Sequence, residues 1–291
     1  MRKWLITLVA VFVANIAWAQ DPERAIKTET AELVPIGSVR ADLGLEFLHR
    51  ARYSLSGFEG DLLRMGTISF HIGVGDYAEF QLSGVGRDFL TITKRAQAIL
   101  PTTVSGDTTS DFGDLILGAK LRFAPEKGAR PAIAFKFAVQ LPNATNESGL
   151  GTDETEFYSS MLFSKHIGKA QVSGNVGLAI LGSPVQPNSQ ADMLTYGLGI
   201  TVPLHAGLEL IGEVSGRQGP AHRIGNEDLS QAQAGVRLRV AGLRWDLAGV
   251  AGLKHFNPGS GLSLDVSYEF QAFHKKRGPV TIRPEKPPIK K

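Results

Sequence analysis

The stretch Leu262-Ser-Leu-Asp-Val-Ser-Tyr-Glu-Phe-Gln271 alternates apolar and polar residues without a break. Successive side chains of a β-strand point to opposite faces, so this pattern predicts a strand with one apolar and one polar face. The segments near 39–49 and 230–240 repeat the same alternation. A strand of about 9–11 residues is long enough to cross a bilayer at a tilt. The pattern therefore indicates membrane-spanning β-strands.

Nine further segments extend this pattern along the chain. They lie near 62–74, 77–88, 112–123, 131–142, 155–167, 171–182, 193–203, 206–217 and 243–255, and Ile116 and Ile211 interrupt the alternation. The total of twelve is even, as a bacterial barrel requires when both chain ends lie in the periplasm. A sheet in lipid must close, because each backbone N–H and C=O needs a partner within the protein. The sequence predicts an all-β fold, a transmembrane antiparallel up-and-down β-barrel of about twelve strands over 38–273.

The connections between these segments are sorted by length. Those after even-numbered strands are short, such as 75–76 and 204–205, whereas those at 89–111 and 143–154 are long and polar. Short periplasmic turns and long external loops are typical of outer-membrane barrels, and a soluble sandwich has no reason to sort its loops in this way. Aromatic residues near strand ends predict girdles at the two membrane interfaces: Phe47, Tyr77, Phe123, Phe157, Trp245 and Phe273.

The two ends of the chain differ from the predicted barrel. Residues 1–19 combine Arg2 and Lys3, an apolar run and Ala17-Trp-Ala19, which together predict a cleavable signal peptide. Residues 20–37 form a periplasmic leader that could enter the lumen but is too short to be a plug domain. The tail 274–291 is basic and rich in proline and is expected to extend into the periplasm. We therefore expect export to the outer membrane of a Gram-negative bacterium.

Composition excludes several classes of protein. The chain has no cysteine, which argues against a disulfide-stapled secreted domain. No later apolar run is long enough for a spanning helix. The net charge of +3 conceals +2 in the first 19 residues and +6 in the tail, so the predicted barrel is acidic. A nucleic-acid partner is therefore not expected.

The middle of the chain carries a family resemblance. It consists of Asp111-Phe-Gly-Asp-Leu-Ile-Leu-Gly-Ala-Lys-Leu-Arg-Phe123, Arg130-Pro-Ala-Ile-Ala-Phe-Lys-Phe137, Gly149-Leu-Gly-Thr152 and Phe163-Ser-Lys-His-Ile-Gly168. This series resembles the outer-membrane transporter family labelled "putative meta-pathway of phenol degradation", best over about 111–180. The resemblance implies uptake of aromatic or other hydrophobic compounds. The tail after Phe273 departs from outer-membrane barrels that end at the final aromatic strand.

Patterns of catalytic residues are weak. Ser69-Phe-His71 and Ser173-Gly-Asn175 approach the nucleophile motif of a barrel phospholipase, but neither has its order, and the G-x-S-x-G elbow is absent. The seven histidines lack metal-ligand spacing. We therefore expect no enzyme, no metal and no cofactor.

The polar row of the strands gives the positive signal of function, because it faces the lumen. The lumen-lining candidates are Glu46, Glu79, Lys120, Lys136, Glu209, Glu213, Arg237, Arg239, Asp246, Asp265 and Glu269. Acids and bases are nearly balanced, which disfavours a strongly ion-selective pore. These groups either line a narrow water-filled path or pair with one another and largely fill the lumen.

Two functions follow from these alternatives. One is a channel for passive uptake of small solutes, and the other is a non-conducting structural or adhesive barrel that acts through its external loops. The expected partners are the lipid bilayer with lipopolysaccharide, a small-molecule solute and the barrel-assembly machinery.

Overall fold

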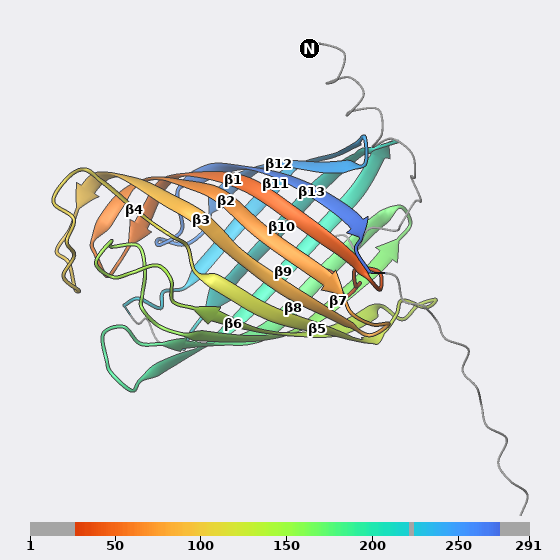
Figure 1. Ribbon diagram of the computed structural model, residues 1–291, viewed down its shortest axis with the longest axis horizontal. Coiled ribbons are helices and arrows are strands. Elements are labelled where there is room, and N and C mark those ends of the chain that lie inside the picture. Colours follow the sequence, from red (N-terminus) through yellow and green to blue (C-terminus); the bar gives the residue numbers. More distant parts are fainter. Residues whose placement is uncertain (1–26, 221–223, 274–291) are drawn as a thin grey trace, which may run out of the picture.

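The computed structural model describes residues 27–220 and 224–273, and every regular element within these ranges is a β-strand (Figure 1). The strands are β1 (Ser38–Tyr53), β2 (Phe58–Gly73), β3 (Ala78–Arg95), β4 (Thr108–Asp111), β5 (Leu115–Ala124), β6 (Ala132–Leu141), β7 (Glu156–Ile167), β8 (Ala170–Gly182), β9 (Gln190–His205), β10 (Leu208–Gln218), β11 (Leu229–Val240), β12 (Leu243–Gly252) and β13 (Ser260–Gln271). No helix in the described ranges is long and apolar enough to cross a membrane.

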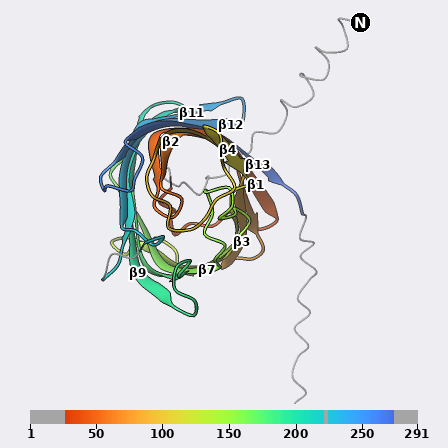
Figure 2. The same ribbon diagram turned by 90° about the vertical axis from the view of Figure 1, so that its left-hand side faces the viewer.

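The sheet closes on itself. Each strand pairs antiparallel with its neighbours, and β1 pairs with β13 on one side and with β2 on the other (Figures 1 and 2). The short β4 pairs only with β3, so twelve strands form the barrel and the thirteenth adds to its rim. The twelve-stranded antiparallel barrel predicted from the alternation is confirmed. Closure gives the backbone polar groups partners without water, as a bilayer requires.

The outer face of the barrel is apolar. Leu43, Leu198 and Leu262 are about three-fifths exposed, at 57%, 62% and 60%, although each lies within a strand. The polar neighbours in the same strands are buried, as with Asp42 at 3%. The strands thus place their apolar row towards lipid and their polar row towards the lumen. The aromatic residues predicted to form girdles are also exposed: Phe47, Tyr77, Phe123, Phe157, Trp245 and Phe273.

The connections separate into a turn end and a loop end. The turn end carries 74–77, 125–131, 168–169, 206–207 and 241–242, together with the start of β1 and the end of β13. The loop end carries 54–57, 96–107, 112–114, 142–155, 183–189, 219–220, 224–228 and 253–259. Figure 2 views the barrel from the loop end, where several of these segments lie across its mouth. By the usual arrangement of such barrels, the turn end faces the periplasm.

The expectation of one long loop over 89–111 was wrong. β3 continues to Arg95, and β4 folds back onto it, with Asp88 opposite Asp111. A second departure lies in β2, where Gly66 has a φ of +69° and sits at a register shift against β1. An extra residue at a bulge exchanges the two faces of a strand. Arg64 and Ser69 consequently both point inward although they are an odd number of residues apart.

The first described segment lies inside the barrel. Of the leader predicted at 20–37, residues 27–37 are described, and Thr28, Ala31 and Val34 are each at most 1% exposed. They contact the lumen wall, so this part of the predicted periplasmic leader enters the lumen, as the sequence analysis allowed. The predicted signal peptide at 1–19 and the basic tail at 274–291 lie outside the described residues.

Candidate functional site in the barrel lumen

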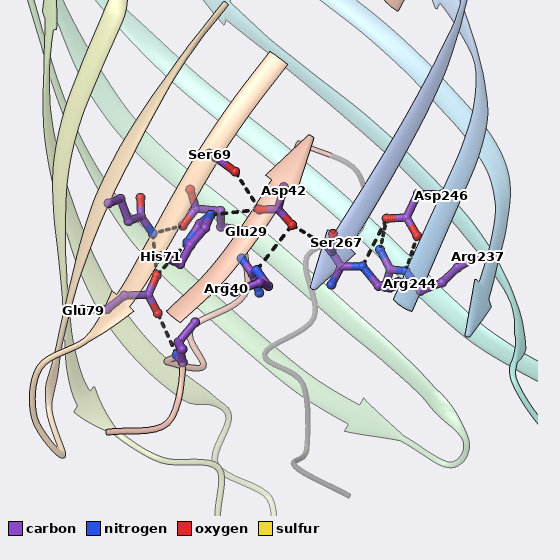
Figure 3. Close-up of polar contacts among 12 residues, drawn as sticks. Glu29, Arg40, Asp42, Ser69, His71, Glu79, Arg237, Arg244, Asp246 and Ser267 are labelled. Atoms are coloured by element: carbon purple, nitrogen blue, oxygen red, sulfur yellow. Dashed lines mark hydrogen bonds and ion pairs between the residues drawn. The ribbon is translucent and has the colours of Figure 1, made fainter. Parts of the chain in front are cut away.

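A belt of ionic side chains follows the inner wall near the turn end (Figure 3). The charged belt consists of Glu209, Arg237, Asp246, Arg244, Asp42, His71, Glu79 and Lys120. These residues come from β10, β11, β12, β1, β2, β3 and β5, which are neighbours in the sheet apart from the intervening β13. The inward row of many strands thus converges on one network because the strands carry polar residues at matching heights.

The tightest part of the belt is the pair between β11 and β12. Arg237 donates from Nε and one terminal nitrogen to the two oxygens of Asp246, at 2.8 and 2.9 Å. Its side chain is fully buried. Arg244 continues the belt, with its Nε 3.6 Å from Asp246 and its terminal nitrogen 3.4 Å from Asp42. The two-point contact between Arg237 and Asp246 fixes both side chains in position.

The belt continues across β1, β2 and β3. Ser69 donates its hydroxyl to Asp42 at 2.6 Å, and His71 Nε2 lies 3.6 Å from the same carboxylate. The other ring nitrogen of His71, Nδ1, lies 2.8 Å from Glu79. Lys120 Nζ is 3.4 Å from Glu79. Acidic and basic groups therefore alternate along this wall, and most of the charge is neutralised locally.

The leader is attached to this wall through its backbone. Glu213 on β10 accepts the amide N–H of Lys27 at 2.7 Å and that of Thr28 at 2.8 Å. Glu79 accepts the amide N–H of Val34 at 2.8 Å. An extended segment inside a closed barrel cannot pair with the sheet, so wall carboxylates take the place of strand carbonyl groups as acceptors.

Side chains of the leader add further contacts. Glu29 forms ion pairs with Lys136 and, at 3.6 Å, with Lys120. Glu32 pairs with Arg122 at 3.0 Å. Ala31 is fully buried and packs with the small inward residues of β6 and with Leu162. The leader therefore occupies the turn-end half of the lumen and packs against the inner face of β5–β7.

The sequence-predicted lumen residues divide into three groups. Glu79, Lys120, Glu209, Arg237, Asp246 and Arg239 lie in or beside the charged belt, with Arg239 3.5 Å from Glu209. Glu46, Lys136 and Glu213 contact the leader. Asp265 lines a small cavity with Asp42, and Glu269 is opposite Arg40 in the β1–β13 register.

The serine and histidine of the predicted Ser69-Phe-His71 segment do not form a nucleophile and base. Ser69 donates to Asp42, while His71 contacts Asp42 and Glu79. Activation of a serine needs a hydrogen bond from its hydroxyl to the base. Within the described residues, no three histidine or carboxylate side chains are arranged to hold a metal ion.

The loop-end half of the lumen is built differently. Leu48, Leu62 and Leu90 point inward and pack together with Phe58 at this end. Beside them lies a cavity of about 480 Å³, the loop-end chamber, which extends from Lys27 to the loop residue Leu150. Its loop-side wall comes from segments 54–55, 149–152 and 256–258. The lumen therefore has a charged half that holds the leader and a partly apolar half that holds the chamber.

Several residues of this site were missed from the sequence. Arg64 lines the chamber and pairs with Glu46 at 3.0 Å, but the bulge at Gly66 hides its inward orientation from a parity count. Glu29 and Lys27 lie in the leader, where no periodic pattern shows which way a side chain points. The interior leucines could have been found, since Leu48 continues the inward parity of Asp42 and Glu46.

The closed sheet, the apolar exterior and the polar interior define this chain as an outer-membrane β-barrel. The family model described as "Putative MetA-pathway of phenol degradation" matches residues 23–242, so the chain belongs to that family. The family suggested by the resemblance is confirmed.

A solved structure shares the fold of this chain, and a second is similar at a lower score. An outer membrane channel from Pseudomonas putida F1 shares 16% identity at a TM-score of 0.60, over 87% of this chain and 100% of that one. The translocator domain of the autotransporter NalP from Neisseria meningitidis shares 12% identity at a TM-score of 0.45, over 80% and 87%. No curated protein sequence matches the chain significantly.

Proposed function

We propose that the chain is a channel for the passive uptake of small solutes across the outer membrane, and that aromatic or hydrophobic compounds are among them. The single observation that carries the proposal is free space beside the first described residues of the leader. Besides the loop-end chamber, cavities of about 230 and 300 Å³ lie on two sides of the leader, and Lys27 lines all three. We infer that the three spaces join beside Lys27 and form part of a path for solutes.

The composition of the walls supports a narrow path. One of the two smaller cavities is lined mainly by β13 and β1–β3, the other mainly by β6–β9, and Ile116 of β5 lines both. Small residues such as Ser83, Gly84 and Ser160 leave room there, whereas the charged belt is largely neutralised by its own pairs. We infer that the size and polarity of a solute govern its passage along these two cavities more strongly than its charge. The family description supports aromatic compounds as solutes, and the barrel-assembly machinery is the expected route of insertion.

The proposal is tested with the purified full-length mature protein. In planar bilayers it should give discrete conductance steps. In liposome-swelling assays, sugars, amino acids and aromatic acids should enter at rates that differ with size and apolar surface. A folded barrel that remains silent in bilayers and admits none of these solutes would contradict the proposal.

A second candidate is a non-conducting barrel that acts through its loops, and the packing of the loop end favours it. Thr103 N donates to Glu147 O at 3.0 Å, and Thr109 Oγ1 on β4 donates to Ser148 O at 2.8 Å. These hydrogen bonds connect loop 96–107 and β4 to loop 142–155. Gly225 N donates to Ser54 Oγ at 3.1 Å. Under this alternative, shortening 96–107 should abolish binding of a surface partner and leave the barrel intact. If shortening altered only solute uptake, the alternative would fail.

A further inference from the structure

The loop-end chamber combines two kinds of wall. Its apolar part includes Leu48 and Leu62, which are 5% and 1% exposed and belong to the interior cluster. The rings of Tyr53 and Phe256 also line it. A volume of about 480 Å³ lies within the range of about 300–1,000 Å³ typical of small-molecule sites. The chamber is therefore large enough for a ring with a short side chain.

The charged part of the chamber is basic. Among the described residues that line it, Lys27, Arg52, Arg64 and Arg217 are basic, and Glu227 is the one acid. Arg217 lies on β10 and donates from Nε to the backbone carbonyl of Glu227 at 3.1 Å. The carboxylate partners of the three other bases are not among the residues that line the chamber. Glu46 pairs with Lys27 and Arg64, Asp88 lies 3.5 Å from Arg64, and Glu59 lies 2.8 Å from Arg52. The side chains of Lys27 and Arg64 are 45% and 32% exposed, whereas that of Glu46, which binds both, is 7% exposed.

This arrangement presents cations to the chamber and keeps their carboxylate partners out of its lining. Arginine forks match the geometry of a carboxylate, and a buried hydrogen bond to a charged group is stronger than one between neutral groups. An apolar wall favours a molecule with an apolar body. We propose that the loop-end chamber is a binding site for small organic anions with an aromatic or alkyl body, of which an aryl carboxylate is the simplest example.

This inference rests on the proposed uptake function and names a class of solute for it. It places the selective step at the loop end, before the solute meets the leader. The charged belt lies deeper in the barrel and is largely neutral, so the basic chamber and not the belt would distinguish an anion from its neutral analogue.

The test uses the mature protein in lipid nanodiscs and isothermal titration with three probes. 4-Phenylbutyrate has both the apolar body and the negative charge. Its neutral amide keeps only the apolar body, and butyrate keeps the charge without the ring. We expect 4-phenylbutyrate to bind at least about tenfold more tightly than either analogue, since one charge-assisted hydrogen bond contributes that much. Equal affinity for the acid and the amide would overturn the assignment of an anion site, and no binding of any probe would overturn the site itself.

Variants locate the site within the protein. Arg217→Gln should weaken 4-phenylbutyrate binding about tenfold and leave the amide unchanged, while Arg217→Lys, which keeps the charge but not the fork, should weaken it less than Arg217→Gln. Lys94→Gln removes one positive charge from a 71% exposed side chain outside the chamber and serves as the matched control. Arg52→Gln replaces Arg217→Gln if the latter does not fold. Equal losses in the control and the chamber variant would contradict the proposal.

The proposed function and this inference fail separately. A barrel that conducts and swells liposomes but does not discriminate the acid from the amide refutes only the anion site. A barrel that binds 4-phenylbutyrate but passes no solute refutes the channel and leaves the binding site in place.

Discussion

Glu213 accepts the backbone N–H of Thr28 at 2.8 Å, although the two residues are 185 positions apart in the chain. The same oxygen accepts the N–H of Lys27, so one wall carboxylate holds two consecutive amides of the leader. This contact joins β10 to a segment that precedes the first strand. It makes the leader part of the lumen wall, and its removal has measurable consequences.

We expect Glu213→Ala to loosen the leader. The two amides lose a charged acceptor worth about 1.5–3 kcal/mol per hydrogen bond, partly replaced by water. Hydrogen exchange at 27–31 should then accelerate by at least about tenfold, while exchange in the strands stays slow. Asp61→Ala is a matched control, because that acid contacts His49 and not the leader. Unchanged exchange at 27–31 would show that Glu213 does not hold the segment.

The Arg237–Asp246 pair should dominate the stability of the β11–β12 wall. Arg237→Met leaves the buried Asp246 without its two-point partner, and breaking such a pair costs about 3–5 kcal/mol. Denaturant unfolding of the micelle-bound barrel measures this loss. The double variant Arg237→Met with Asp246→Leu should recover a large part of it, because Arg244 keeps Asp42 as a partner and Glu209 keeps Arg239. A double variant as unstable as the single one would count against this account.

Gly66 should be required for the bulge in β2. Its φ of +69° lies in the left-handed region, where an L-residue costs about 1–2 kcal/mol. A Cβ at this position meets no atom closer than 3.9 Å, so the cost of Gly66→Ala is conformational and not steric. Gly75→Ala is the control, since it has open space and no positive φ. Equal unfolding midpoints for the two variants would exclude strain at Gly66.

The contact between β4 and loop 142–155 should weaken in acid. Asp111 lies on β4, outside the barrel strands, and accepts the backbone N–H and the hydroxyl of Thr145, both at 2.8 Å. Partial burial opposes its ionisation, but hydrogen bonds from Thr145 and Ser148 outweigh this effect and hold the pKa of Asp111 below its ordinary value.

Because the pKa of Asp111 is lower in the folded protein, the ionised carboxylate stabilises this contact fully at pH values above the unfolded pKa of about 3.9. This stabilisation is lost as the pH falls through the folded pKa. Amide exchange at Thr145, corrected for intrinsic rates, should therefore stay protected from pH 7 to about 4 and lose protection below that. Asp111→Asn should remove the pH dependence. Protection that is independent of pH in the wild type would contradict the role of Asp111.

The sequence predicted the barrel well because a membrane-spanning strand must alternate. Ile116 and Ile211 break that rule for a local reason. Ile211 is 3% exposed and packs inside the barrel against Ala248, and Ile116 lines a cavity. β4 was missed because Thr108–Asp111 is too short to show a period and has only one partner strand. The sequence left open whether the leader enters the lumen, because its backbone contacts depend on wall residues such as Glu79 and Glu213.

The most direct test of the central claim asks whether solute passes through the lumen. The natural chain has no cysteine, so Thr195→Cys introduces one thiol where the loop-end chamber meets the cavity beside β6–β9. Leu198→Cys, at a position 62% exposed on the outer face, is the control. Reaction with a bulky methanethiosulfonate should reduce solute uptake into liposomes for Thr195→Cys and leave Leu198→Cys unchanged. Undiminished uptake after complete labelling of Cys at position 195 would contradict a path through the lumen.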